Sequence, residues 1–305
     1  MNDLTDVDGA SAGHDWLVLR AGELEVWIAP HIGGSIARFD RVARGGRQHL
    51  MRAAEVDTPD AVEMASFPLV PFVNRVRDGR FMCDGRTIEL APNMAGDPSP
   101  LHGQGWRARW TVDAQDAAHV VLSFNHAAGE WPWDYTATQR IALDADGLTL
   151  TLTCHNRSAL RMPCGLGLHP YHPCGPETVL DTEVDGVWTV DADVLPVERV
   201  PATGRYDLRA RRICGQALDN GYDGWSGVAL IHWPGQPASL RLTSDDAKYF
   251  QVYSPAAGGL FVAEPVQHTN AALNEPQSAW RDLGIVMLAP GSTRSITARY
   301  DVLVG

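Results

Sequence analysis

The sequence predicts an all-β fold, an antiparallel sandwich or barrel built from many short strands. Apolar and polar side chains alternate with a period of two in several segments, and turns that contain Gly or Pro recur between them. A helical period is almost absent, and residues 57–63 are expected to form a short turn at most. Short strands joined by tight turns are typical of antiparallel sandwiches and barrels.

The strand pattern is clearest in three segments, each with its apolar residues on one parity. These positions are Val120, Leu122 and Phe124; Leu148, Leu150 and Leu152; and Ile296, Ala298, Tyr300, Val302 and Val304. Threonines fill the intervening positions of the second segment, which predicts a half-buried strand after a turn at 144–147. Further turns are predicted at Asp84-Gly85, Pro234-Gly235, residues 257–259 and Pro290-Gly291.

The 305 residues are enough for one large β domain or for two ordinary domains. No linker-like segment divides the chain, and no repeat of about 20–50 residues is visible in it. We therefore predict a single domain over residues 1–305, with a flexible N-terminal segment at 1–15.

Composition and charge argue against several classes of function. Hydrophobic residues make up 45% of the chain and charged residues 20%, which fits a soluble globular protein. The formal net charge of −12 is opposite to the basic surplus that nucleic acids and anionic membranes attract. No apolar run approaches the roughly 18 residues of a membrane span, and the N-terminus lacks the basic and apolar regions of a signal peptide. We therefore expect no nucleic-acid partner and no membrane partner.

The chain has five cysteines, none of them in a C-x-x-C pair. They are Cys83, Cys154, Cys164, Cys174 and Cys214. An odd number at loose spacing suits reduced thiols better than a disulfide framework, which predicts a cytoplasmic protein.

His169 lies in the segment 165–173, where the strand pattern gives way to a loop. An imidazole has an unperturbed pKa of about 6.5, so it can give or take a proton at little cost near neutral pH. Pro170 and Pro173 stiffen the loop, which favours a positioned ring over one that only fills space. A hydrogen-bonded structural histidine is the alternative.

Two further segments supply candidate partners for His169. His102 stands between a turn and two glycines, where the backbone can approach a ligand closely. Glu264 follows the apolar run 260–263 and precedes Pro265, which predicts a partly desolvated carboxylate at a strand end, with a pKa raised toward neutrality. A structural histidine and an ordinary edge-strand glutamate are the alternatives.

Other residues are candidates for ligand binding. Asn74 and Arg75 follow two prolines, and the Arg75 guanidinium is suited to hold vicinal hydroxyls or a carboxylate. Asp219 and Asp223 lie in a Gly-containing segment that a solvated turn explains equally well. Four tryptophans are expected in loops, where they can stack on sugar C–H faces, although most tryptophans pack in cores: Trp106, Trp131, Trp133 and Trp225.

Several established chemistries find no support. No G-x-S-x-G, H-E-x-x-H or P-loop pattern occurs, and the dinucleotide fingerprint is incomplete. The spacing of His169 and His172, taken with His102, is not a recognised ligand spacing, so no metal is expected. Glu264 and Asp219 keep a glycosidase open, since such an enzyme needs two carboxylates that flank the scissile bond.

Taken together, these motifs resemble those of the aldose 1-epimerase (galactose mutarotase) family along almost the whole chain. The matching segments, in the order that the family has them, are 22–34, Asn74-Arg75 with 79–81, 101–106, 147–171 and 264–274. Each motif is weak alone, but five in this order make a specific signal.

The resemblance implies a large antiparallel β-supersandwich of the galactose mutarotase type, with few or no helices, a sugar cleft and no cofactor. It implies that His169 protonates the ring oxygen of a pyranose, that Glu264 removes the proton of the C1 hydroxyl, and that His102 lies near the ring oxygen. The ring opens, C1 rotates, and reclosure inverts the anomer. The residues implied in sugar binding are Arg75, Asp219, Asn74 and Trp106.

Some features are left open by the resemblance. Asp219 is preferred over Asp223 because it follows a leucine as the family motif does, whereas Asn220 stands where a His or an acidic residue is common. His172 has no role assigned. The expected partner is a free monosaccharide, and the expected assembly is a monomer or a homodimer.

Two alternatives to an epimerase of neutral sugars remain. One is a carbohydrate-binding protein on the same scaffold that does not catalyse turnover. The other is a mutarotase for phosphorylated or sulfonated sugars, because four arginines could form an anion pocket: Arg75, Arg77, Arg80 and Arg107.

Overall fold

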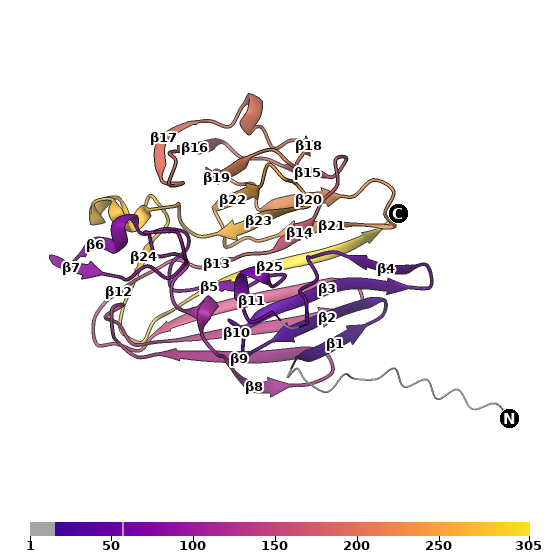
Figure 1. Cartoon of the computed structure of the whole chain (residues 1–305). Coiled ribbons are helices and arrows are strands. Elements are labelled where there is room, and N and C mark those ends of the chain that lie inside the picture. Colours follow the sequence, from indigo (N-terminus) through magenta and orange to yellow (C-terminus); the bar gives the residue numbers. More distant parts are fainter. Residues whose placement is uncertain (1–15, 57) are drawn as a thin grey trace.

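The computed structural model describes residues 16–56 and 58–305, and it is an all-β molecule whose strands pair antiparallel (Figure 1). The predicted fold class is therefore confirmed. The expected flexible segment 1–15 lies outside the described residues. In the described part of the chain, no helix is long and apolar enough to cross a membrane.

The largest sheet has nine strands. In order across the sheet they are β18 (Arg211–Arg212), β15 (Val179–Thr182), β20 (Val228–His232), β21 (Ala238–Thr243), β25 (Thr293–Val304), β11 (Gly147–Asn156), β10 (Tyr135–Asp144), β9 (His119–His126) and β8 (Thr111–Gln115). Figure 1 shows its β11 to β8 part below β22 and β23, which belong to the second large sheet.

The second large sheet carries most of the residues discussed below as a candidate site. Its strands are β17 (Pro196–Pro201), β16 (Gly186–Val190), β19 (Leu218–Asp223), β22 (Tyr249–Ser254), β23 (Leu260–Val266), β13 (Gly167–Leu168) and β5 (Pro68–Leu69), with β14 (Tyr171–Pro173) also paired to β23.

The remaining strands form smaller sheets. They are β1 (Leu17–Ala21), β2 (Leu24–Ala29), β3 (Ser35–Ala43) and β4 (Gly46–His49) in one sheet, β6 (Arg80–Cys83) with β7 (Arg86–Glu89), and β12 (Met162–Cys164) with β24 (Val286–Leu288). The helical elements are single 3-10 turns: η1 (Ala61–Glu63), η2 (Arg77–Gly79), η3 (Gly105–Arg107), η4 (Gly204–Tyr206), η5 (Ala272–Asn274) and η6 (Gln277–Ala279). The first of them falls within the short turn predicted at 57–63.

The predicted alternation sets which faces of the strands are buried. Along β11 the three leucines are buried and the threonines between them are half-buried, as expected. Leu150 lies opposite Ile141 of β10 and Ala298 of β25, so three strands contribute to one apolar face. One buried cluster joins this face to Phe39 of β3 and Phe250 of β22. The core therefore lies between the sheets and holds them together.

The turn chemistry is also as predicted at the hairpin between β6 and β7. Asp84 and Gly85 both have positive φ, 48° and 75°, and they connect Cys83 to its register partner Arg86. Two consecutive residues with positive φ match the twist of a tight hairpin, and Asp and Gly tolerate that conformation.

One alternative is ruled out and one expectation about local structure is wrong. Asp219 and Asp223 lie within strand β19, which rules out the solvated turn. Cys174 and Cys214 form a disulfide, whereas reduced thiols were expected; Cys83, Cys154 and Cys164 are free and buried. The pair is 40 residues apart in sequence, and the fold brings the two Cα atoms to 5.6 Å, which spacing alone could not indicate. The cytoplasmic location stays a prediction.

Candidate active site

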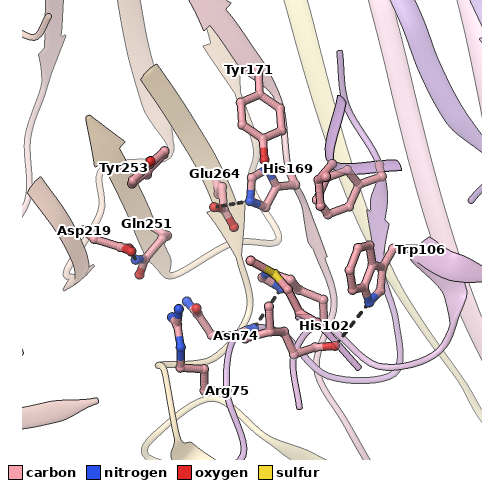
Figure 2. Close-up of a pocket in the computed structure, with 14 residues that line it drawn as sticks. Asn74, Arg75, His102, Trp106, His169, Tyr171, Asp219, Gln251, Tyr253 and Glu264 are labelled. Atoms are coloured by element: carbon pink, nitrogen blue, oxygen red, sulfur yellow. Dashed lines mark hydrogen bonds and ion pairs between the residues drawn. The ribbon is translucent and has the colours of Figure 1, made fainter. Parts of the chain in front are cut away.

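A cavity of about 310 Å³ opens beside the second large sheet. It is lined by all seven residues that were predicted as site residues (Figure 2). These are Asn74, Arg75, His102, Trp106, His169, Asp219 and Glu264. Seven further residues of the lining were not predicted from the sequence: Val62, Phe67, Met94, Leu101, Tyr171, Gln251 and Tyr253.

The two walls of the cavity have different origins. One wall is the sheet, where β19 contributes Asp219, β22 contributes Gln251, β23 contributes Glu264, and the link between β13 and β14 contributes His169. The other wall consists of loops from residues 62–75 and 94–106. Residues that directly face each other in antiparallel strands project to the same side, and Gln251 is the register partner of Glu264.

His169 and Glu264 are in direct contact. The Nε2 atom of His169 lies 3.2 Å from Oε1 of Glu264 (Figure 2), and both residues are buried, with 8% and 2% of their surface exposed. Glu264 lies within β23, not at a strand end as predicted. The His169 ring stacks on Phe67 at a centroid distance of 4.4 Å, and its backbone N–H donates to the Phe67 carbonyl. Ring and backbone contacts therefore both fix this imidazole.

Burial controls the protonation of this pair. It lowers the pKa of His169 to about 3, a shift that the charge of Arg52 increases and the backbone of His169 itself opposes. Burial raises the pKa of Glu264 well above its usual value, with the Asp219 charge adding to the rise and Arg75 opposing it. Each shift disfavours the charged form of its group, which favours a neutral imidazole beside a protonated carboxyl.

The neutral pair contains the same number of protons as the alternative state, in which Glu264 is a carboxylate and His169 is an imidazolium. A proton that moves across the 3.2 Å contact between Glu264 and His169 turns the pair into one base and one acid, with no change of net charge. The other carboxyl oxygen of Glu264, Oε2, is buried and has no hydrogen-bond partner among the described residues. The arrangement is thus suited to remove one proton and supply another to a bound molecule.

His102 is held in one tautomer by its neighbour. The backbone N–H of Asn74 donates to Nδ1 of His102 at 3.1 Å, so the proton of the neutral ring resides on Nε2. Burial, together with the neighbouring His169 and Arg75 side chains, lowers the pKa of His102 well below its usual value. His102 is therefore a neutral hydrogen-bond donor, and its ring meets that of His169 edge to face at 5.4 Å.

Two ionisable groups, those of Arg75 and Asp219, line the remaining side of the cavity. Arg75 Nε donates to Asp97 at 2.9 Å, and Figure 2 shows its guanidinium directed toward the part of the cavity that contains Asp219 and Gln251. Gln251 Nε2 donates to Oδ1 of Asp219 at 2.7 Å. Burial raises the pKa of Asp219, and Arg75 and the Gln251 hydrogen bond act against that rise. Both groups are oriented before any ligand binds, which lowers the entropy cost of binding.

The aromatic lining is less extensive than predicted. Trp106 lies at the cavity wall, stacked on Phe67, with its indole N–H donating to the Leu101 carbonyl at 3.2 Å. Three other tryptophans lie in loops, as predicted, but they are buried in the core and do not line the cavity: Trp131, Trp133 and Trp225.

Two other candidates lie apart from the cavity. Asp223 is at the end of β19, where its carboxylate pairs with Arg199. His172 is fully buried on β14, and its Nδ1 is 2.8 Å from the Leu50 carbonyl, so it is a structural histidine. Of the two aspartates left open by the sequence, only Asp219 faces the cavity.

One of the missed residues, Tyr171, had a signal in the sequence. Tyr171 belongs to the same proline-stiffened segment as His169, and its ring lies 4.7 Å from that of His169. The Arg52 guanidinium stacks over this tyrosine at 3.8 Å. Gln251 had no such signal, since only strand pairing places it beside Glu264. Within the described residues, no group of three or more His, Cys, Asp or Glu side chains is placed to hold a metal ion.

Comparison with known proteins identifies the family. The family model for aldose 1-epimerase matches residues 17–301. The chain belongs to the aldose 1-epimerase family. Among curated proteins, YphB of Escherichia coli K12, an uncharacterized protein, is 32% identical over 256 residues, which cover 80% of this chain and 86% of YphB. Uncharacterized YihR of the same strain is 26% identical over 199 residues, or 61% of this chain and 63% of YihR.

Solved structures of similar proteins have the same fold. An Escherichia coli K12 protein provisionally described as an aldose 1-epimerase superposes with a TM-score of 0.86 at 28% identity, over 96% of this chain and all of that one. A galactose mutarotase-like protein of Clostridium acetobutylicum superposes with a TM-score of 0.84 at 18% identity, over 96% of each chain.

Proposed function

We propose that this protein is an aldose 1-epimerase that interconverts the α and β anomers of a free, neutral monosaccharide. The observation that carries the proposal is the contact between His169 and Glu264 inside a cavity that also contains His102, Arg75 and Asp219. Family membership supports the general activity.

In the proposed mechanism, Glu264 and His169 react as the carboxylate and imidazolium form of the pair. Glu264 takes the proton of the C1 hydroxyl while His169 gives its proton to the ring oxygen, so the bond from C1 to that oxygen breaks and an aldehyde forms. After C1 rotates, the C5 hydroxyl attacks the other face. His169 then takes back the proton of that hydroxyl, and Glu264 returns its proton to the carbonyl oxygen.

The other residues bind and orient the sugar in this proposal. His102 donates its Nε2–H toward the ring oxygen, and Arg75 and Asp219 hold hydroxyls, with Trp106 and Asn74 completing the wall. Asp219 accepts from hydroxyls and Arg75 donates to them, so the two together suit a polyol that has both donors and acceptors.

A neutral sugar is favoured over a phosphorylated or sulfonated one. Three of the four arginines considered for an anion pocket do not line the cavity: Arg77, Arg80 and Arg107. The fourth, Arg75, is already paired with Asp97, and the Asp219 carboxylate would repel an anion. The cavity therefore lacks an uncompensated cation for such a group.

The test is anomer exchange followed by polarimetry, or by NMR saturation transfer, on freshly dissolved α-glucose and α-galactose and then on a wider panel of aldoses. Glu264→Gln keeps the shape of the side chain but cannot take the proton, so kcat should fall about 10²–10⁴-fold. Asp223→Asn is the matched control, because Asp223 is paired with Arg199 outside the cavity, and it should keep wild-type activity.

The proposal is abandoned if wild type and Glu264→Gln both match the uncatalysed rate across the panel. Sugar-dependent tryptophan fluorescence without anomer exchange would instead identify a carbohydrate-binding protein on this scaffold. Competition of inorganic phosphate or sulfate with sugar binding would indicate that the substrate is an anionic sugar.

A further inference from the structure

The loop that carries Asn74 and Arg75 is held along one edge by side chains from a single distant segment. The backbone N–H of Val73 donates to Nε2 of His268 at 2.9 Å, that of Arg75 to Oδ1 of Asn270 at 3.0 Å, and that of Arg77 to Oδ1 of Asn274 at 2.7 Å. Alternate amides of the loop thus reach three acceptors within residues 268–274. We call this segment the amide clamp.

The other edge of the loop is held by residues 100–102. The N–H of Asn74 donates to His102 Nδ1 at 3.1 Å and that of Val76 to the Pro100 carbonyl at 3.0 Å, while the N–H of His102 donates back to the Asn74 carbonyl. Every amide from 73 to 77 is therefore bonded, and the two edges alternate as in a strand. On the amide clamp's edge, side chains take the place of a neighbouring strand.

A strand neighbour accepts hydrogen bonds through its backbone whatever its sequence, whereas the amide clamp depends on three particular side chains. The loop needs this support because Asn74 has a φ of 55°, a conformation that is uncommon for residues other than glycine. Asn74 and Arg75 both line the cavity, so a shift of this backbone moves two cavity groups together.

The amide clamp is itself rigidly placed. His268 is buried, and its Nδ1 lies 2.8 Å from the Thr269 carbonyl, so the proton is on Nδ1 and Nε2 is free to accept from Val73. A Cβ on Gly165 would come within 2.2 Å of this ring, which shows how closely the backbone encloses it. Asn270 uses its amide group to donate to the Val194 carbonyl at 2.7 Å.

We propose that His268, Asn270 and Asn274 are positioning residues, which set the location of Asn74 and Arg75 and thereby the affinity for substrate. None of the three lines the cavity, so they act through the loop and not on the sugar. The effect on affinity rests on the proposed function, while the effect on the loop does not.

The test compares two variants of Asn270. Asn270→Leu removes both the acceptor for the Arg75 amide and the donor to Val194. Asn270→Asp loses the same donor but keeps an acceptor oxygen at the same reach, so the difference between the variants isolates the bond to Arg75. We expect KM to rise about tenfold in Asn270→Leu with kcat within about threefold of wild type, and KM to recover to within about threefold in Asn270→Asp.

Gln277 offers a matched control on the same stretch of chain. Its Oε1 accepts from the Asp84 backbone N–H at 2.8 Å, the same kind of bond, but it holds the β6–β7 turn, which does not line the cavity. Gln277→Leu should leave KM unchanged. Thermal denaturation of each variant shows whether it is folded.

Amide hydrogen exchange supplies a readout that does not depend on catalysis. The Arg75 amide should exchange faster in Asn270→Leu than in wild type or Asn270→Asp, and equally slowly in Gln277→Leu. Unchanged exchange and unchanged KM in Asn270→Leu would overturn the inference, as would an equal rise of KM in Gln277→Leu. If wild type turns over no sugar but exchange at Arg75 changes as expected, the proposed function fails and the positioning role stands.

Discussion

At the scale of single residues, the chemistry of the site is set by desolvation. His169 and Glu264 are ordinary groups whose burial moves their pKa values in opposite directions, down to about 3 for the imidazole and well up for the carboxyl. Each shift disfavours the charged form of its group. The closeness of the two groups then allows one proton to create both an acid and a base.

The same burial predicts a pH-dependent effect of Glu264 on stability. Folding raises its pKa above the unfolded value of about 4.5, so between these two pKa values the folded state binds more protons than the unfolded state, and stability falls as pH rises. The stabilising contribution is complete below about pH 4.5 and is lost as pH rises through the folded pKa.

Glu264→Gln removes this titration. The free energy of unfolding of the variant, relative to wild type, should therefore increase from pH 4 to pH 8, by about 1.4 kcal/mol for each unit by which the folded pKa is raised, within that range. Urea denaturation at several pH values measures the difference. A constant or decreasing difference would contradict the raised pKa.

At the scale of elements, strand β11 shows how a local pattern becomes a core. Its leucines project between the sheets because side chains alternate along a strand, and its partners β10 and β25 add apolar residues at the same level. The sequence was sufficient to predict this strand and the turn before it. It was not sufficient for β13, which has two residues and is defined by its neighbours β5 and β23.

Leu150→Ala should lower the free energy of unfolding by about 2–5 kcal/mol, because it removes a buried side chain from a close-packed layer and leaves a cavity. Its exposure is 1%, so the full side chain is lost from the interior. Thr138→Ala on β10 is the comparison. Thr138 lies on the half-exposed parity of that strand, and its replacement should change stability by less than about 1 kcal/mol in the same denaturation experiment. Equal losses of unfolding free energy in Leu150→Ala and Thr138→Ala would mean that the apolar layer around Leu150 repacks.

At the scale of the whole molecule, contacts between segments far apart in the chain determine features that the strand pattern does not predict. The disulfide Cys174–Cys214 connects the residue after β14 to the segment between β18 and β19. Closing a loop of this size restricts the unfolded chain and stabilises the fold by about 4 kcal/mol in the chain-entropy model.

Thiol titration in denaturant tests this disulfide. Without reductant it should detect three thiols per chain, and after reduction five. Reduction should also lower Tm, and the double variant Cys174→Ser/Cys214→Ser should show the lower Tm with no further effect of reductant. Five thiols before reduction would show that the pair is not oxidised.

The sequence by itself determined the fold class, because alternation and turn chemistry are local properties of the chain. Through its motifs it also picked out seven residues that share one cavity. The tertiary structure alone decided that Asp219 and not Asp223 faces that cavity, that Gln251 stands beside Glu264, and that Cys174 pairs with Cys214. These facts depend on strand order, register and the docking of loops, which arise from contacts between residues far apart in the chain and leave no local pattern.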